Sequence, residues 1–469
     1  MIIKRKRFKI IVFNLLIVMI MSLFMYFNWN RNIKNEDWIY SFSGVALILL
    51  VMQLLCFKSL SIKITDFRCL FVMMSYVFLL GRYFVYALGQ ADNYNLFFYR
   101  YSNGELYRTA LFSLSFIQAI FCGFLFYSEG TAKELQGQVD KINSDKMLFY
   151  IGIILFIIGF PCEVYRNFII MFTQMATDKY IAENLIGMNG VVTSLGRLAA
   201  VAVLFIICSK KLKKNSAEII TFLFIAIEMG MSIFTGARSY TVIAAIVIVI
   251  CLINMYGIEL SLGKIIGFII IGYLCICFIS SISDVRTLSG VTLSLFIKTW
   301  VNNIFSGKIL YEVLLEFGNT QNTIGMGLKY LDGTDEFRRG KTIVLAWLSA
   351  IPGIQRLIPQ ISLIYNPIDI MKEYMPGYYF GGSLALDMYM NFGKFGIITS
   401  IFLGIILSKM MQVNEQTDLK SYGLFYGMYY IFLRMVRCGI SEVTRLLIYM
   451  FIIYYIIQTV ICKLTIKRG

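Results

Sequence analysis

The sequence contains no histidine, and only 15% of its 469 residues are charged. Without histidine the protein cannot use an imidazole as an acid, a base or a metal ligand, which excludes Ser-His and Cys-His nucleophile pairs. Any catalysis must therefore depend on carboxylates, tyrosine, lysine, arginine or a metal held by oxygen. A soluble protein of this length would carry more charge, so the shortage of charged residues argues against a soluble protein.

Paired cysteines are missing as well. The ten cysteines include no CxxC motif, and nearly all of them lie inside apolar runs. Small buried side chains are the ordinary role of such cysteines, so we expect no disulfides and no zinc site. The sequence also has no clear acidic triplet of the kind that binds a divalent metal. We therefore expect neither a metal nor another cofactor.

Hydrophobic residues make up 58% of the chain and come in runs of roughly 20, the length that crosses a bilayer as a helix. Only helices and closed barrels satisfy their backbone in lipid, and no alternating barrel pattern is present. We therefore predict an all-α integral membrane protein. About twelve spans are expected: Phe8–Asn28, Asp37–Phe57, Phe67–Gly89, Thr109–Ser128, Met147–Phe172, Leu185–Cys208, Ala217–Phe234, Ser239–Tyr256, Lys264–Ile282, Leu384–Lys409, Ser421–Val436 and Arg445–Cys462.

Basic residues predict the orientation of these spans. The net charge is +16, but the lysines lie mostly in short loops beside spans, so we expect no nucleic-acid partner. With the N-terminus inside, the inner segments hold most of the lysines and arginines, including those of residues 210–214. This distribution follows the rule that basic residues stay in the cytoplasm. We therefore expect both termini to be cytoplasmic.

One connection differs from the others. Between Ser283 and Ser383 no apolar run is long enough for a full span, and four of the five prolines lie between residues 352 and 376. A structureless loop of this length would be unusual, so we predict a helical cap on the outer side with a functional role. The predicted organisation is a bundle of spans one to nine over residues 1–282, the cap over residues 283–383, and spans ten to twelve over residues 384–469.

Arginines gather on the predicted outer side. A charge at the edge of hydrocarbon is costly unless it has a partner or a function, and a guanidinium group suits two-point contact with phosphate oxygens. We therefore predict a site for an anionic substrate carried by lipid at this side. The outer arginines are Arg238, Arg286, Arg338, Arg339, Arg356, Arg434, Arg437 and Arg445.

Most of these arginines have a structural alternative. Arg238 could reach the lipid headgroups, and Tyr240 beside it could bind a sugar or phosphate or cap a helix. Arg434 and Arg437 are three residues apart and would repel each other unless an anion lies between them. Pairing of these arginines with Glu442 is the alternative to binding a pyrophosphate.

Other ionisable residues lie in or near the spans. Asp387 falls near the outer edge of an apolar run, where an ionisable group is a functional candidate, and a salt bridge to one of the outer arginines is its structural alternative. Arg338 and Arg339 could equally form a solvated surface. For Arg166 and Arg197 we expect contact with headgroups or bonding between helices.

Two short motifs resemble those of the bacterial O-antigen or capsule repeat-unit polymerases of the Wzy type. They are Gly236-x-Arg238 ahead of a span, and Gly382-Ser383 … Asp387-x-Tyr389-x-Asn391-Phe392-Gly393-x-x-Gly396 at the start of another. The arrangement of the spans and the presence of one long outer loop are also similar to this family, so the resemblance covers most of the chain. The family often has glutamate where Asp387 stands. The related O-antigen ligases usually carry a histidine in the long outer loop, and its absence here favours a polymerase.

The resemblance implies a membrane glycosyltransferase of the GT-C type, with its site at the outer leaflet of the bacterial cytoplasmic (inner) membrane. The donor and the acceptor would both be undecaprenyl-pyrophosphate-linked oligosaccharides. A hydroxyl of the acceptor would attack the anomeric carbon of the donor, and undecaprenyl pyrophosphate would leave. The product would belong to lipopolysaccharide O-antigen or to capsule, and a chain-length regulator and a flippase would be partners. The alternative functions are a flippase or transporter of lipid-linked oligosaccharide, and an O-antigen ligase.

The resemblance also assigns roles to the arginines. Arg238 would bind the pyrophosphate together with Arg286 and with Arg437 or Arg434. Fixed guanidinium groups stabilise the negative charge that grows on a departing pyrophosphate, and arginine stays charged at any relevant pH. The remaining outer arginines would contribute to substrate binding.

A sugar hydroxyl needs a base, and without histidine a carboxylate is the natural choice. The resemblance makes Asp387 the first candidate, followed by Glu442 and Glu373. Tyr240 and Tyr389 are the candidates for contact with the sugar or the phosphate.

Overall fold

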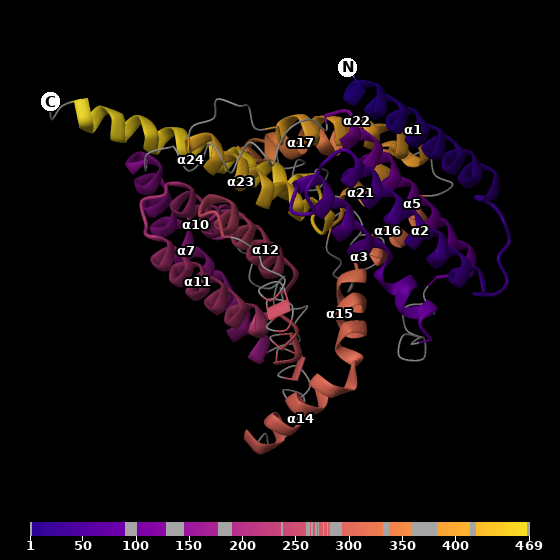
Figure 1. Ribbon diagram of the computed structural model, residues 1–469, viewed down its shortest axis with the longest axis horizontal. Coiled ribbons are helices and arrows are strands. Elements are labelled where there is room, and N and C mark those ends of the chain that lie inside the picture. The colour runs from indigo at the N-terminus through magenta and orange to yellow at the C-terminus, as the bar shows by residue number, and fades with distance from the viewer. Residues whose placement is uncertain are drawn as a thin grey trace.

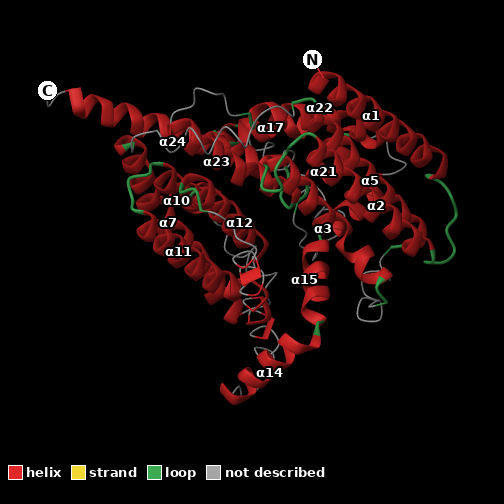
Figure 2. Ribbon diagram, in the orientation of Figure 1, coloured by secondary structure: helices red, strands yellow, loops and turns green. Residues whose placement is uncertain are grey.

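The computed structural model describes residues 2–89, 101–127, 145–176, 190–235, 238–258, 293–331, 337–351, 353–358, 382–412 and 419–466, and some positions between 263 and 281. Helices are the regular secondary structure of these residues, and no strand occurs among them (Figure 2). The described part includes nine helical segments that are long and apolar enough to cross a membrane. The prediction of an all-α multi-pass membrane protein is confirmed, while the count of twelve spans stays a prediction.

The first group of helices lies at one end of the molecule (Figure 1). Within it α5 packs against α1, α3, α16 and α22, and α2 packs against α3. Of the membrane-spanning candidates, α5 is the most enclosed, with 89% of its apolar window buried. The group consists of α1 (Ile2–Asn28), α2 (Trp38–Ser59), α3 (Phe67–Ala87), α5 (Asn103–Leu125), α16 (Gln321–Leu331), α21 (Leu384–Phe392) and α22 (Gly396–Met410).

The second group lies on the opposite side in Figure 1. In this group α7 packs against α9, α10 and α11, and α12 packs against α10 and α11. The break between α9 and α10 falls at Leu198, so the described part of the predicted span Leu185–Cys208 consists of two helices separated by one residue. The group consists of α7 (Lys146–Ala176), α9 (Gly190–Arg197), α10 (Ala199–Cys208), α11 (Lys214–Thr235) and α12 (Arg238–Met255).

A hairpin near the C-terminus joins the two groups. It comprises α23 (Leu419–Leu433), one turn of 3₁₀ helix η3 (Arg434–Val436), and α24 (Ile440–Ile466). In the second group α23 contacts α10 and α12, and α24 contacts α7 and α9. Towards the first group, η3 contacts α3 and α21. The turn around η3 is therefore the place where helices from both groups meet.

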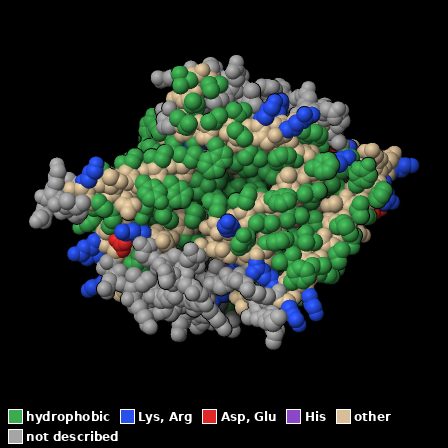
Figure 3. Space-filling model, turned by 90° about the horizontal axis from the view of Figure 1, so that it is seen from above, with side chains coloured by type: hydrophobic (Ala, Val, Ile, Leu, Met, Phe, Trp, Pro, Cys, Tyr) green, Lys and Arg blue, Asp and Glu red, His purple; other side chains and the backbone are tan. Residues whose placement is uncertain are grey.

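The outer faces of the helices are apolar. Side chains such as Phe24 and Phe27 of α1, Phe222 of α11 and Phe402 of α22 are each about half exposed or more. Figure 3 shows hydrophobic side chains covering most of one face, with lysine and arginine mainly towards its margins. Exposed apolar surface on this scale marks an interaction with lipid or protein, and here it matches helices of membrane-spanning length.

Polar side chains inside the first group tie its helices together. The Gln118 amide of α5 donates to Asn14 Oδ1 of α1 at 2.9 Å, and the Gln53 amide of α2 donates to Gln118 Oε1 at 2.6 Å. All three side chains are buried. Hydrogen bonds of this kind between membrane helices fix which helices are neighbours and in what register.

The described part of the predicted cap is helical. It forms α14 (Leu293–Ser306), α15 (Lys308–Gly318), α16, α17 (Lys341–Ser349) and the short α18 (Ile354–Leu357). Among these, α15 packs on α3, α16 on α5 and α21, and α17 on α24. Ile324 and Met326 of α16 are buried in the core. Part of the predicted cap therefore belongs to the core of the first group of helices, and its role as an outer cap stays a prediction.

Small residues allow α5 and α22 to approach closely. A Cβ atom added to Gly404 of α22 would lie 2.5 Å from the Ile120 carbonyl oxygen and 3.1 Å from Gly123 Cα of α5. Both contacts are with backbone, which cannot move away as a side chain can. Gly123 faces the α22 backbone equally closely, so this contact requires glycine on both helices.

Substituting Gly404→Ala should lower the free energy of unfolding by about 1–3 kcal/mol, because the added methyl group forces two helices apart. The matched control is Gly44→Ala in α2, where an added Cβ meets no atom within 4 Å. Thermal unfolding in detergent measures both variants. Equal stability of the two variants would contradict the close contact between α5 and α22.

Candidate functional site

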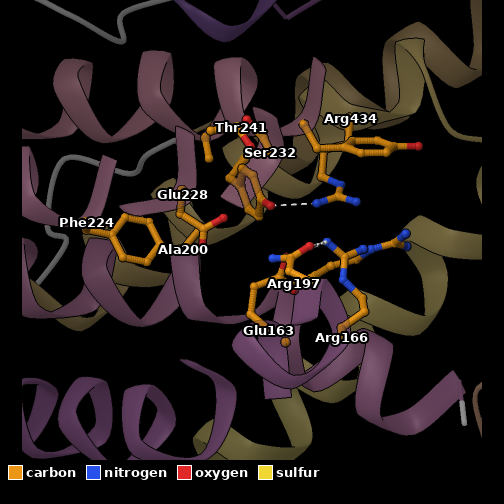
Figure 4. A pocket seen from close by; sticks show the side chains of 14 residues that line it. Glu163, Arg166, Arg197, Ala200, Phe224, Glu228, Ser232, Thr241 and Arg434 are labelled. Carbon is orange, nitrogen blue, oxygen red and sulfur yellow. Dashed lines mark hydrogen bonds and ion pairs between the residues drawn. The ribbon is translucent and has the colours of Figure 1, made fainter. Parts of the chain in front are cut away.

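A polar cleft lies between the second group of helices and the C-terminal hairpin. The cleft is narrow: about 460 Å³ of space between its lining atoms is not filled by atoms, open solvent included, and only about 30 Å³ admits the centre of a water-sized sphere. Figure 4 shows charged side chains from several helices pointing into it. The residues that line it are Glu163, Arg166, Asn167, Gly196, Arg197, Ala200, Phe224, Glu228, Ser232, Tyr240, Thr241, Ala244, Tyr430 and Arg434.

Three guanidinium groups converge on this cleft from separate elements. Arg166 belongs to α7, Arg197 is the last residue of α9, and Arg434 begins η3. Figure 4 shows their side chains turned towards one another. Arg434 is only 1% exposed, so its charge lies inside the protein. Burying a guanidinium group is expensive unless nearby groups compensate its charge.

Glu442 supplies part of that compensation. Its Oε1 atom lies 2.6 Å from Arg197 Nη1 and also forms an ion pair with Arg434 Nη2. Glu442 is in the first turn of α24, directly across the turn from Arg434. One carboxylate oxygen therefore holds arginines from α9 and η3 together.

Two tyrosines, Tyr240 and Tyr430, also contact the guanidinium groups of Arg197 and Arg434. The Arg434 guanidinium carbon lies 4.3 Å from the centre of the Tyr240 ring, and that of Arg197 lies 5.5 Å from it. Arg434 Nη1 donates to the Tyr430 hydroxyl at 2.6 Å. Cation–π contacts in a site with little water stabilise a buried charge by up to about 2 kcal/mol.

The third arginine has its own carboxylate. Arg166 forms an ion pair with Glu163 one turn earlier in α7, and Asn167 donates to the same Glu163 oxygen at 3.2 Å. Gly196 of α9 makes this arrangement possible, because a Cβ atom there would lie 2.9 Å from the Glu163 backbone nitrogen. The close approach of α9 to α7 brings Arg197, the next residue, to the cleft.

The guanidinium groups keep unused hydrogen-bond donors. Within the part of the chain that the structure describes, the Nε atoms of Arg166, Arg197 and Arg434 are buried and have no acceptor. A buried donor without an acceptor costs about 1–3 kcal/mol. Three guanidinium groups lining one cleft, with donors to spare, suit an anion with several oxygen atoms, such as a phosphate.

The structure places some of the predicted site residues at this cleft. Arg434 and Tyr240 line it, and Glu442 pairs with its arginines. The pairing of Arg434 with Glu442, which the sequence left as an alternative, is present in the structure. Arg238 begins α12 two residues before Tyr240, but its side chain lies outside the described residues.

Asp387 lies on the other side of the hairpin turn. Its carboxylate is 3% exposed and accepts a hydrogen bond from the Ile440 N–H at the start of α24. A Cβ atom on Gly439 would lie 2.5 Å from one of its oxygens. The carboxylate thus compensates the positive end of the α24 dipole. In the same turn the Cys438 thiol donates to the Arg434 carbonyl oxygen, and burial raises the pKa of this thiol.

Other predicted residues lie apart from the cleft lining. Arg437 donates to Thr320 Oγ1 of the predicted cap at 2.6 Å. Tyr389 is buried in the first group, with its ring 5.1 Å from that of Phe112. Arg445 lies beside the start of α9. Arg434 and Arg437, which the sequence placed as neighbours, therefore have different partners.

The loop before α17 carries two more predicted arginines. The backbone N–H groups of Arg338 and Arg339 donate to the carbonyl oxygens of Met390 and Asn391 at 2.9 and 2.8 Å, which attaches this loop to the end of α21. The Arg339 side chain is exposed.

Three candidates lie wholly or partly outside the described residues. Arg286 and Glu373 lie outside the described residues, and only the backbone of Arg356 is described. Their roles in substrate binding or catalysis stay predictions.

Sequence reasoning assigned only one of the five charged residues that line the cleft, Arg434, to a site. Arg166 and Arg197 were expected to contact headgroups or neighbouring helices, and Glu163 and Glu228 were not singled out. The signal was present, because each is an ionisable residue inside an apolar run, where such residues are functional candidates. The sequence did not reveal that α7, α9 and α11 bring these four residues together beside Arg434 of η3.

Comparison with known proteins decides the family. A sequence profile described as O-antigen polysaccharide polymerase Wzy matches residues 10–469, nearly the whole chain. The chain belongs to this family. No curated protein and no solved structure gives a significant match. Membership of the Wzy family indicates a polymerase of O-antigen repeat units, hence a glycosyltransferase type of activity in a multi-pass membrane protein.

Glu442→Gln should lower the free energy of unfolding of this Wzy protein by about 3 kcal/mol, because it leaves two buried guanidinium groups without their shared carboxylate. Arg197→Met should also destabilise it. In the double variant the loss should be smaller than the sum of the single losses by about 1 kcal/mol or more. Chemical unfolding in detergent measures this coupling, and strictly additive losses would contradict the shared ion pair.

Asp387→Asn should remain folded and active, because an amide oxygen can still accept the Ile440 N–H. Asp387→Ala loses that acceptor and should be about 1 kcal/mol less stable. Thermal unfolding and the length of the glycan chains made in cells measure the two effects. If Asp387→Asn is stable yet yields only single repeat units, the carboxylate itself is required, as a catalytic base would be.

Proposed function

We propose that this Wzy protein joins undecaprenyl-pyrophosphate-linked oligosaccharide repeat units and releases undecaprenyl pyrophosphate. The convergence of Arg166, Arg197 and Arg434 on one cleft is the observation that carries this proposal. A pyrophosphate offers several anionic oxygens at the spacing that guanidinium groups can bind in pairs.

The guanidinium groups act on the leaving group. When the acceptor hydroxyl attacks the anomeric carbon, the bond from that carbon to the pyrophosphate oxygen breaks, and negative charge grows on the pyrophosphate. Arg197 and Arg434 are already held in place by Glu442 and the tyrosines. Donors that are fixed before the reaction need not reorganise during it, and each contributes about 10²–10³ to the rate.

We assign the cleft to the outer leaflet of the bacterial cytoplasmic membrane. It lies beside the end of α11, the start of α12 and the end of α23. The opposite ends of these helices carry Lys213, Lys214 and Lys420. Since basic residues favour the cytoplasmic side, the arginine cleft belongs on the outer side, where lipid-linked repeat units are polymerised in this proposal. Arg238, at the head of α12, is placed by the proposal at the mouth of the same cleft.

Arg434→Lys should abolish long glycan chains while the protein still inserts in the membrane. Lysine keeps the charge but cannot make the paired contacts of a guanidinium group, so the polymerisation rate should fall at least about 10²-fold. The matched control is Arg31→Lys in the exposed loop between α1 and α2, which should leave chain length unchanged. Gel analysis of the glycan in cells measures both.

Normal chain lengths with Arg434→Lys would contradict the proposed site.

Deleting the gene distinguishes the function of a polymerase from that of a flippase. Loss of a polymerase leaves single repeat units exposed on the outer leaflet, whereas loss of a flippase retains them inside, and the latter result would overturn the proposed function.

A further inference from the structure

Glu228 is the one carboxylate at the arginine cleft that the structure leaves without a partner among the described residues. It lies on α11, lines the cleft and is half-buried. Figure 4 shows its carboxylate pointing into the cleft, on the side opposite the three arginines. No hydrogen bond or ion pair connects it to another described residue. Its oxygens are therefore available to a ligand in the cleft.

The other carboxylates near the hairpin are occupied. Glu163 is paired with Arg166, and Glu442 with two arginines. Asp387 accepts the Ile440 N–H and is almost fully buried. A base needs a lone pair that faces the substrate, and a carboxylate held by guanidinium groups is a weak proton acceptor. In the described part of the chain Glu163 Oε2 also has no hydrogen-bond partner, but this atom is buried and the other oxygen of Glu163 is held by Arg166 and Asn167. Among these four groups, Glu228 is the one that lines the cleft and has neither an ion pair nor a hydrogen bond to a described residue.

We propose that Glu228 is the general base of glycosyl transfer, an inference that rests on the proposed function of the cleft. Its carboxylate takes the proton of the acceptor sugar hydroxyl. The hydroxyl oxygen forms the new bond to the anomeric carbon of the donor, and the bond between that carbon and the pyrophosphate oxygen breaks. The electron pair of the broken bond leaves with undecaprenyl pyrophosphate, so no further reactant is needed.

The charges around the cleft fit this order of events. Arg166, Arg197 and Arg434 carry three positive charges, and Glu163, Glu228 and Glu442 carry three negative charges when all are ionised. When Glu228 accepts the proton, one positive charge is left in excess. This excess positive charge appears while the pyrophosphate gains negative charge. Proton transfer to Glu228 therefore strengthens the stabilisation of the leaving group.

The test compares Glu228→Gln with Glu218→Gln in the full-length protein purified in detergent. Glu218 lies on the same helix, ten residues before Glu228, and does not line the cleft. Single repeat units on their lipid, extracted from cells lacking this gene, serve as the substrate. Glu228→Gln should reduce kcat by about 10²–10⁴-fold with little change in KM, because glutamine cannot accept the proton. Glu218→Gln should behave as the unchanged protein.

Thermal unfolding shows whether each variant is folded. Glu228→Asp keeps the carboxylate on a shorter arm and should recover part of the lost rate. Wild-type kcat in a folded Glu228→Gln variant would overturn the role of Glu228, as would a loss confined to KM. If Arg434→Lys is inactive while Glu228→Gln is fully active, only this inference fails. If both are fully active, the proposed function of the cleft fails as well.

Discussion

The shared ion pair of Glu442 with Arg197 and Arg434 is the interaction on which the site depends. It joins the end of α9, the 3₁₀ turn η3 and the first turn of α24 through one carboxylate oxygen. In a protein interior, charges of like sign stay close only when a counter-charge holds them. Glu442 thus holds two guanidinium groups beside the cleft, and the buried Nε atoms of Arg197 and Arg434 have no acceptor among the described residues.

The position of that carboxylate depends in turn on where α24 begins. Asp387 of α21 binds the first backbone N–H of α24, two residues before Glu442. Gly439 leaves room for this contact. The first group of helices thus fixes the start of α24, and Glu442 of α24 holds Arg197 of the second group and Arg434 of the hairpin. This explains how residues of the second Wzy-like motif could influence the cleft without lining it.

The sequence predicted the fold class well, because membrane-spanning helices can be recognised as apolar runs of a characteristic length. The predicted span Ala217–Phe234 agrees with α11 (Lys214–Thr235) within a few residues. Breaks inside spans were not predictable from hydropathy. The span Leu384–Lys409 is divided by the turn η2 (Gly393–Phe395) into α21 and α22, and Gly393 has a positive φ of 57°, a conformation that glycine adopts without strain.

The sequence predicted a cluster of guanidinium groups, but it did not predict which residues form the cluster. The expectation of guanidinium groups at one end of the bundle came from residues near loops, such as Arg434. Arg197 and Glu228 lie within apolar runs, and their meeting depends on the packing of α9 and α11 against α7 and the hairpin. Packing between distant helices leaves no local pattern in a single sequence. The family match to residues 10–469 identified the function independently of these residues.

The central claim is that the arginine cleft holds the pyrophosphate of the lipid-linked substrate. A cryo-EM structure of the full-length protein with an undecaprenyl-pyrophosphate-linked repeat unit tests it directly. The account predicts phosphate oxygens at about 2.7–2.9 Å from guanidinium nitrogens of Arg197 and Arg434, with Glu228 facing the sugar. Density for the pyrophosphate at any other place, with these arginines bonded only to Glu442 and the tyrosines, would contradict it.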